Sequence, residues 1–271
     1  MSLEILFGIM VGLILGLTGA GGGILAVPAL VIGLGWSMTQ AAPVALMAVG
    51  AAAALGALDG LRKGLVRYRA ATLMAVLGAG FTPVGLYVAH RLPESGLSAL
   101  FSLVLIAVAV RMARQPRSPQ PLAQAPGDQG WEQKNCMLDE TTGRLKWTLK
   151  CSATLALVGS FCGLLTGLLG VGGGFLLVPA FRQLTDIRAH AVVATSLMVI
   201  ALISLTAIIG ALYSGVRIPV EGVIFILACM GGMLAGRVVA PKVSAQVLQL
   251  GFAALCVLVA GALLYKTWFQ A

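Results

Sequence analysis

The sequence predicts an all-α polytopic membrane protein made of two homologous halves, and three observations support this fold class. Hydrophobic residues make up 59% of the 271 residues and charged residues only 10%. The mean hydropathy is +0.99, which is more apolar than a soluble core accommodates. One glycine-rich phrase also occurs twice, at 19–29 (GAGGGILAVPA) and at 170–180 (GVGGGFLLVPA).

The apolar residues fall into about eight stretches, and most of them have the roughly 20 residues that a spanning helix needs. We therefore expect a multi-pass membrane protein, surrounded by lipid. The stretches are 3–34, 40–60, 70–90, 95–113, 148–181, 190–213, 217–240 and 244–266.

The two glycine phrases lie 151 residues apart, and the same offset relates Gly12 to about Arg111 with Gly163 to about Ala262. Four prolines and mixed charges interrupt the apolar pattern between these halves, as is typical of a linker. The sequence thus predicts a first transmembrane repeat at 1–114, a cytoplasmic linker at 115–146 and a second repeat at 147–271.

The first stretch of each repeat is too long for one crossing, since a helix over 3–34 would measure roughly 48 Å against a core of about 30 Å. The triple glycine, with Pro28 or Pro179 after it, predicts a helix break. If the broken stretch still crosses, the repeats are parallel and 13 of the 18 basic residues share the linker's face. If it folds back as a re-entrant hairpin, the repeats are inverted and 15 of the 18 basic residues lie on the same face as the linker. The positive-inside rule favours the second arrangement.

Non-helical backbone within a membrane must line protein or a water-filled cavity, and a helix that starts after a break presents free N–H groups to an anion. We therefore expect two converging breaks to bind a small anion, with Thr18 and Thr166 as further hydroxyls near them. The predicted binding residues are Gly21, Gly22, Gly23, Ile24, Gly172, Gly173, Gly174, Phe175, Thr195, Ser196 and Arg182. The alternative role for glycine is close helix packing, which we expect at Gly12, Gly16, Gly163 and Gly167. Nucleotide binding is not expected, because neither phrase has the required spacing.

The other polar residues fit a role in anchoring the protein at the membrane surface better than a catalytic or ligand-binding role. The net charge of +9 comes mainly from loops, which argues against nucleic-acid binding. Asp59 is expected to pair with Arg62 and Lys63, whereas Arg237 either lines a pathway or reaches to the interface. Four cysteines are interpreted as small core residues, with no metal, cofactor or disulfide framework expected: Cys151, Cys162, Cys229 and Cys256.

In its two glycine phrases, each followed by Val-Pro-Ala, and in Ala194-Thr195-Ser196-Leu197, the chain resembles the sulfite exporter TauE/SafE family of membrane permeases. The resemblance implies a bacterial inner-membrane carrier that exports small sulfur-containing anions such as sulfite or organosulfonates. It also implies coupling to a proton or sodium gradient and allows a homodimer. The first repeat has Val44-Ala45-Leu46 in place of Thr-Ser-Leu, so hydroxyl contacts are expected from the second repeat alone.

Two other classes of function were weighed. An intramembrane serine hydrolase would use Ser37, which lies in a GxSx pattern, together with His90 or His190. A membrane assembly or scaffold protein would carry no substrate.

Overall fold

The computed structural model describes residues 2–19, 22–114, 136, 148–185, 189–213, 219–240, 251 and 253–263. Apart from one isolated bridge at Cys136, these residues form α-helices and short connections, which confirms the all-α prediction. The named helices are α1 (Ser2–Thr18), α2 (Gly23–Gly33), α3 (Met38–Arg62), α4 (Tyr68–Arg91), α5 (Glu94–Arg114), α6 (Leu149–Leu169), α7 (Gly174–Leu184), α8 (Ala189–Tyr213) and α9 (Val220–Val239). A further apolar helix covers Ala253–Leu263.

Five of the described helices are long and apolar enough to cross a membrane: α3, α4, α6, α8 and α9. Large apolar side chains stand on their outer surfaces, such as Val76 and Leu157 at 71% exposure and Val238 at 72%. Contiguous apolar surface of this kind suits contact with lipid rather than water. The predicted count of eight spanning segments stays a prediction, because α1, α2, α5 and Ala253–Leu263 are shorter.

Each of the two over-long apolar stretches is a pair of antiparallel helices. In the first, Gly22 at the start of α2 packs on Leu15, and Gly33 at its end packs on the ring of Phe7 near the start of α1. In the second, Gly173 before α7 packs on Cys162 and Thr166 of α6. Both broken stretches therefore fold back on themselves, as the hairpin alternative requires.

The glycines, and not the prolines, end the first helix of each hairpin. Gly19 (φ +75°) and Gly170 (φ +70°) adopt the left-handed conformation. Their N–H groups bond to the carbonyls of residues four earlier, at 2.8 and 2.9 Å, which is a common way to end a helix. Pro28, by contrast, is buried inside α2, and the backbone of α7 is helical through Pro179. The predicted role of these prolines as helix breaks is thus wrong, because the chain has already turned before it reaches them.

The centre of the bundle is the antiparallel pair α3 and α8. Gly50 of α3 packs on Ser204, just past the middle of α8, and Gly60 packs on Ala194, near its start. Small residues at these contacts let the two backbones approach closely.

Two parallel helix pairs flank this centre, α1 with α9 and α4 with α6. Gly8, Gly12 and Gly16 of α1 face successive turns of α9, and Gly159, Gly163 and Gly167 of α6 face successive turns of α4. A Cβ at Gly12 would collide with the Cys229 carbonyl, and one at Gly163 with the Gly78 carbonyl. The predicted packing role is therefore confirmed for Gly12, Gly16, Gly163 and Gly167.

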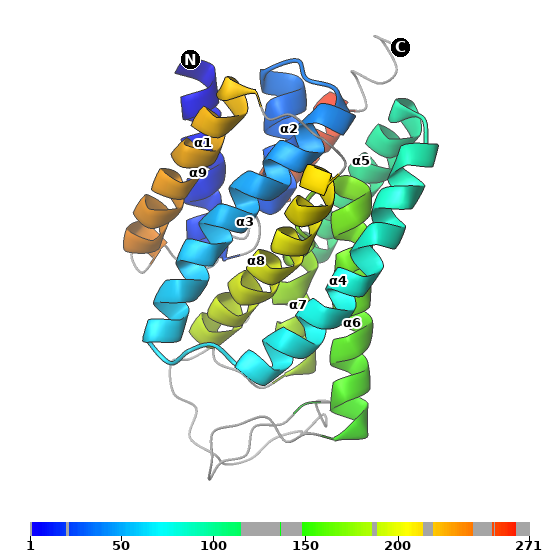
Figure 1. Cartoon of the computed structure of the whole chain (residues 1–271). Coiled ribbons are helices and arrows are strands. Elements are labelled where there is room, and N and C mark those ends of the chain that lie inside the picture. The colour runs from blue at the N-terminus through cyan, green and yellow to red at the C-terminus, as the bar shows by residue number, and fades with distance from the viewer. Residues whose placement is uncertain are drawn as a thin grey trace.

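The two hairpins point in opposite directions along the bundle (Figure 1). Helix α1 starts at the end marked N, whereas α6 starts at the opposite end. The tips of the hairpins, where the glycine phrases lie, are thereby directed toward the interior from opposite sides.

Candidate functional site

The two glycine breaks meet inside the bundle. A Cβ built on Gly23, the first residue of α2, would lie 2.5 Å from the carbonyl oxygen of Val171 in the second break. Only a glycine at position 23 allows this approach of the two backbones. The junction of the breaks is defined here by Gly23, Val171 and Gly172.

The central helices α3 and α8 enclose this junction. A Cβ on Gly172 would lie 3.5 Å from Val49 Cγ1, 3.4 Å from Ile200 Cγ2 and 3.6 Å from Ser204 Oγ. These are ordinary van der Waals distances, so the position is closely surrounded without being blocked. Gly172 has a φ of +74°, which favours glycine independently of the available space.

Two helix N-termini start at the junction without side-chain caps. Neither Gly22 before α2 nor Gly173 before α7 has a side-chain cap hydrogen bond. At the two helix starts, the Leu25 N–H donates to the Gly22 carbonyl at 3.1 Å and the Leu176 N–H donates to the Gly173 carbonyl at 3.3 Å. The backbone N–H groups that precede Leu25 in α2 and Leu176 in α7 belong to the first turn of each helix. They carry the partial positive charge of a helix N-terminus.

The predicted binding residues fall into three groups. Gly22, Gly23, Gly172, Gly173 and Gly174 lie at the breaks, and Ile24 is buried in the first turn of α2. Gly21 lies outside the described residues, as do the side chains of Phe175, Pro179 and Arg182, although the backbone of the last three belongs to α7.

The third group consists of hydroxyls, and most of them already use their protons. Thr18, Thr166 and Thr195 donate to the carbonyls of Ile14, Cys162 and Ala191 at 2.7–2.8 Å. Thr195 also accepts the Arg67 N–H at 3.1 Å. A hydroxyl bonded in this way has no proton left for an anion. Ser196 differs, because its Oγ is buried without a hydrogen-bond partner in the described part of the chain.

The sequence reasoning missed Ser204, the polar side chain nearest to Gly172. Ser204 is fully buried, and its Oγ likewise has no partner among the described residues. A serine inside an apolar helix usually bonds to its own backbone, so the sequence alone gave little reason to select it. The sequence signal that could have pointed to Ser204 is a difference between the repeats, because the equivalent position, 151 residues earlier, is Ala53.

Comparison with known proteins identifies the family. The model of the family described as "Sulfite exporter TauE/SafE" matches residues 4–263, which is nearly the whole chain. The chain belongs to the sulfite exporter TauE/SafE family. It is 30% and 29% identical, over 192 residues, to proteins from two strains of Xylella fastidiosa, 9a5c and Temecula1. Both are named "Probable membrane transporter protein", and each alignment covers 70% of this chain and 66% of the relative. No solved structure matches the chain significantly.

Membership of the TauE/SafE family and five long apolar helices identify a multi-pass membrane protein. Its charged residues include a cluster between two helices. Asp59 Oδ2, in the last turn of α3, lies 2.9 Å from both Lys63 Nζ and Arg237 Nη1. Arg237 Nη1 also donates to the Gly56 carbonyl at 2.6 Å. The expected pairing of Asp59 with Lys63 is confirmed, and Arg237 of α9 joins it as a cross-link to α3.

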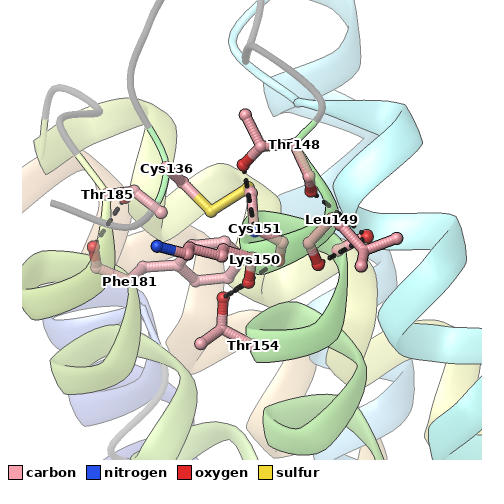
Figure 2. The surroundings of a disulfide bond; sticks show 9 residues. Cys136, Thr148, Leu149, Lys150, Cys151, Thr154, Phe181 and Thr185 are labelled. Atoms are coloured by element: carbon pink, nitrogen blue, oxygen red, sulfur yellow. Dashed lines mark hydrogen bonds between the residues drawn. A yellow bond between two sulfur atoms is a disulfide. The ribbon is translucent and has the colours of Figure 1, made fainter.

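The prediction that Cys151 is a core residue outside any disulfide is wrong. Cys151 forms a disulfide with Cys136, and both are buried. The Cys136 N–H also donates to the Leu184 carbonyl at 3.1 Å. Figure 2 shows Cys136 between the first turn of α6, which carries Cys151, and the end of α7, which carries Phe181 and Thr185. Cys136 therefore clamps the open end of the second hairpin. Sequence reasoning missed the pair because the spacing between the two cysteines resembles no known motif.

The serine weighed as a nucleophile has a structural role in this TauE/SafE protein. Ser37 is the N-cap of α3, and its Oγ accepts the Gln40 N–H at 3.4 Å. Ser37 Oγ also lies 3.0 Å from Thr39 Oγ1. The description of the family and the names of the relatives indicate transport rather than hydrolysis.

Proposed function

We propose that this protein is a secondary transporter that exports small sulfur-containing anions, such as sulfite or organosulfonates, across the bacterial inner membrane. The observation that carries this proposal is the junction, where Gly23 approaches Val171 and two uncapped helix starts come together. The identity of the anion rests on the family, whose description names sulfite.

The physical properties of the junction suit a carrier. One helix N-terminus stabilises an anion by about 0.3–1 kcal/mol when exposed and by up to ~2 kcal/mol when partly buried. Two such ends, with a hydroxyl beside them, hold a small anion loosely enough to release it. Gly172, whose Cβ position has no neighbour closer than 3.4 Å, leaves its backbone accessible to an oxyanion.

We propose further that the chain consists of two repeats with inverted topology, 1–114 and 147–271, joined by a cytoplasmic linker at 115–146. Two features support this arrangement. The bounds of α7 and α8 follow those of α2 and α3 at the offset of 151 residues, and the two hairpins point in opposite directions (Figure 1). Inverted repeats with discontinuous helices at their interface are common in transporters that alternate access.

Transport is proposed to be coupled to a proton or sodium gradient, and the protein to work in lipid as a monomer or a homodimer. The predicted ligands stay part of this proposal: the glycines of both breaks, Ile24, Phe175, Thr195, Ser196 and Arg182. Of the hydroxyls, Ser196 has the better claim, because Thr195 already donates to a carbonyl.

The proposal is tested with the purified full-length protein in proteoliposomes. Uptake or release of sulfite is measured in competition with thiosulfate, sulfate, methanesulfonate and acetate, under imposed proton or sodium gradients. We expect saturable sulfite flux that sulfonates reduce and acetate does not. Flux no greater than that of protein-free liposomes for every anion would refute transport.

A further inference from the structure

Ser204, like Ser196, differs from the other buried hydroxyls of the bundle. Thr82, Ser102, Thr166 and Thr195 each donate to the carbonyl four residues earlier. Ser204 Oγ makes no such bond and has no partner in the described part of the chain, although its side chain is fully buried. A buried donor that is left unpaired is costly and needs an explanation, such as a ligand or an ordered water.

The hydroxyl of Ser204 is positioned at the junction. Its Oγ lies 3.6 Å from the Cβ position of Gly172 and 3.4 Å from that of Gly50. Because both residues are glycines, no side chain stands between this hydroxyl and the backbone of the second break. The other groups around Gly172, Val49 and Ile200, are apolar and leave Ser204 as the side-chain donor there.

We infer that Ser204 is the specificity-determining donor of the junction and that its hydroxyl binds one oxygen of a small oxyanion held at the start of α7. The inference rests on the proposed function and adds a residue to it. A hydrogen bond from a neutral hydroxyl to a charged acceptor is stronger than one between neutral groups. A bound oxyanion would thus give the buried Ser204 hydroxyl the hydrogen-bond partner that the described residues do not provide.

The inference also makes the junction asymmetric. The position 151 residues before Ser204 is Ala53, and the one before Ser196 is Ala45. Ser196, Ile200 and Ser204 recur every four residues along α8 and therefore lie on one stripe of the helix. Both unpaired hydroxyls thus come from the same helix, and they are separated by about 12 Å along its axis.

The test compares Ser204→Ala and Ser204→Cys with Ser102→Ala as the matched control, since Ser102 is equally buried but bonds to Ser98 at 2.9 Å. Sulfite flux and the sulfite-induced shift in Tm are measured for each purified protein. We expect Ser204→Ala to weaken sulfite affinity by about 10- to 100-fold. Ser204→Cys, with its weaker S–H donor, is expected to fall between Ser204→Ala and wild type.

The Tm without any anion gives a second readout. Ser204→Ala removes an unpaired buried hydroxyl, so its anion-free Tm is expected to equal or exceed that of wild type. Higher stability combined with weaker sulfite binding distinguishes a ligand-binding hydroxyl from a merely structural one.

Each outcome decides between the two proposals. Wild-type sulfite affinity in Ser204→Ala, with flux intact in the wild type, overturns the role of Ser204 and leaves transport standing. An equal loss of affinity in Ser102→Ala also overturns it. A wild-type protein that neither binds nor moves any anion of the panel refutes the proposed function and this inference together.

Discussion

The substitution Gly172→Ala adds one methyl group at the junction. That methyl would lie 3.4 Å from Ile200 Cγ2, 3.5 Å from Val49 Cγ1 and 3.6 Å from Ser204 Oγ, so it fits without displacing its neighbours. It would nevertheless cover the backbone that the glycine leaves open. We therefore expect Gly172→Ala to fold and to lose transport.

The cost in stability comes from the backbone, because Gly172 has a φ of +74°. An alanine in the left-handed region costs roughly 1–2 kcal/mol. Gly64→Ala provides a control with the same strain, since Gly64 has a φ of +66° and nothing lies within 4 Å of its Cβ position. Both variants should lose similar thermal stability in detergent.

The two variants should differ in transport. If the methyl removes one charge-assisted contact to the anion, sulfite flux falls by about 10- to 100-fold in Gly172→Ala. Gly64→Ala, which lies in the connection between α3 and α4, should retain wild-type flux per folded protein. Wild-type flux in Gly172→Ala, or an equal loss in both variants, would contradict the placement of the site. The larger substitution Gly173→Leu is a poorer test, because a Cβ there already lies 2.5 Å from the Cys162 carbonyl.

Three further predictions concern the scaffold. Replacing Arg237 by leucine removes its pair with the partly exposed Asp59 and a carbonyl bond, so we expect a loss of about 1–2 kcal/mol, measured by thermal unfolding with Asp59→Asn as the second arm of a double-mutant cycle. Substituting Cys136 by serine opens a disulfide with a sequence separation of 15, which costs about 3 kcal/mol in the chain-entropy model. Dithiothreitol should lower the Tm of the wild type to that of this variant and leave the variant unchanged. Gly163→Ala places a methyl against the backbone of α4 and should destabilise the protein by about 1–3 kcal/mol, whereas Gly231→Ala, with nothing within 4 Å, should not.

Local sequence signals predicted the helix breaks and the packing glycines because each signal acts within a few residues. The over-long apolar stretches required a break at the glycine phrases, and the charge count favoured a hairpin over a continued crossing. Pro28 was assigned the wrong role because α2 stays helical through this buried residue, although a proline at the sixth position of a helix removes one backbone hydrogen bond. The structure keeps it inside α2.

The remaining features depend on contacts between distant parts of the chain. Arg237 reaches Gly56 and Asp59 only because α9 packs beside α3. Ser204 becomes a candidate ligand only when its missing backbone bond and its distance to Gly172 are known. Neither contact has a local signature in the sequence. The change from Ala53 to Ser204 between the repeats marks the position, but it does not show which groups lie beside it.

The clamp formed by Cys136 and Cys151 gives a final prediction about topology. With the linker on the cytoplasmic face, as 15 of the 18 basic residues favour, the pair lies in a reducing compartment, where disulfides rarely persist. We therefore expect both thiols to be free in growing cells and to pair after oxidation or purification in air. To measure this, cells are precipitated with acid and the protein is unfolded in SDS, so that a maleimide that adds mass reaches every free thiol, before and after diamide, with Cys136→Ser as the reference. Complete protection of the pair in untreated cells would place this end of the bundle in the periplasm and would overturn the orientation derived from charge.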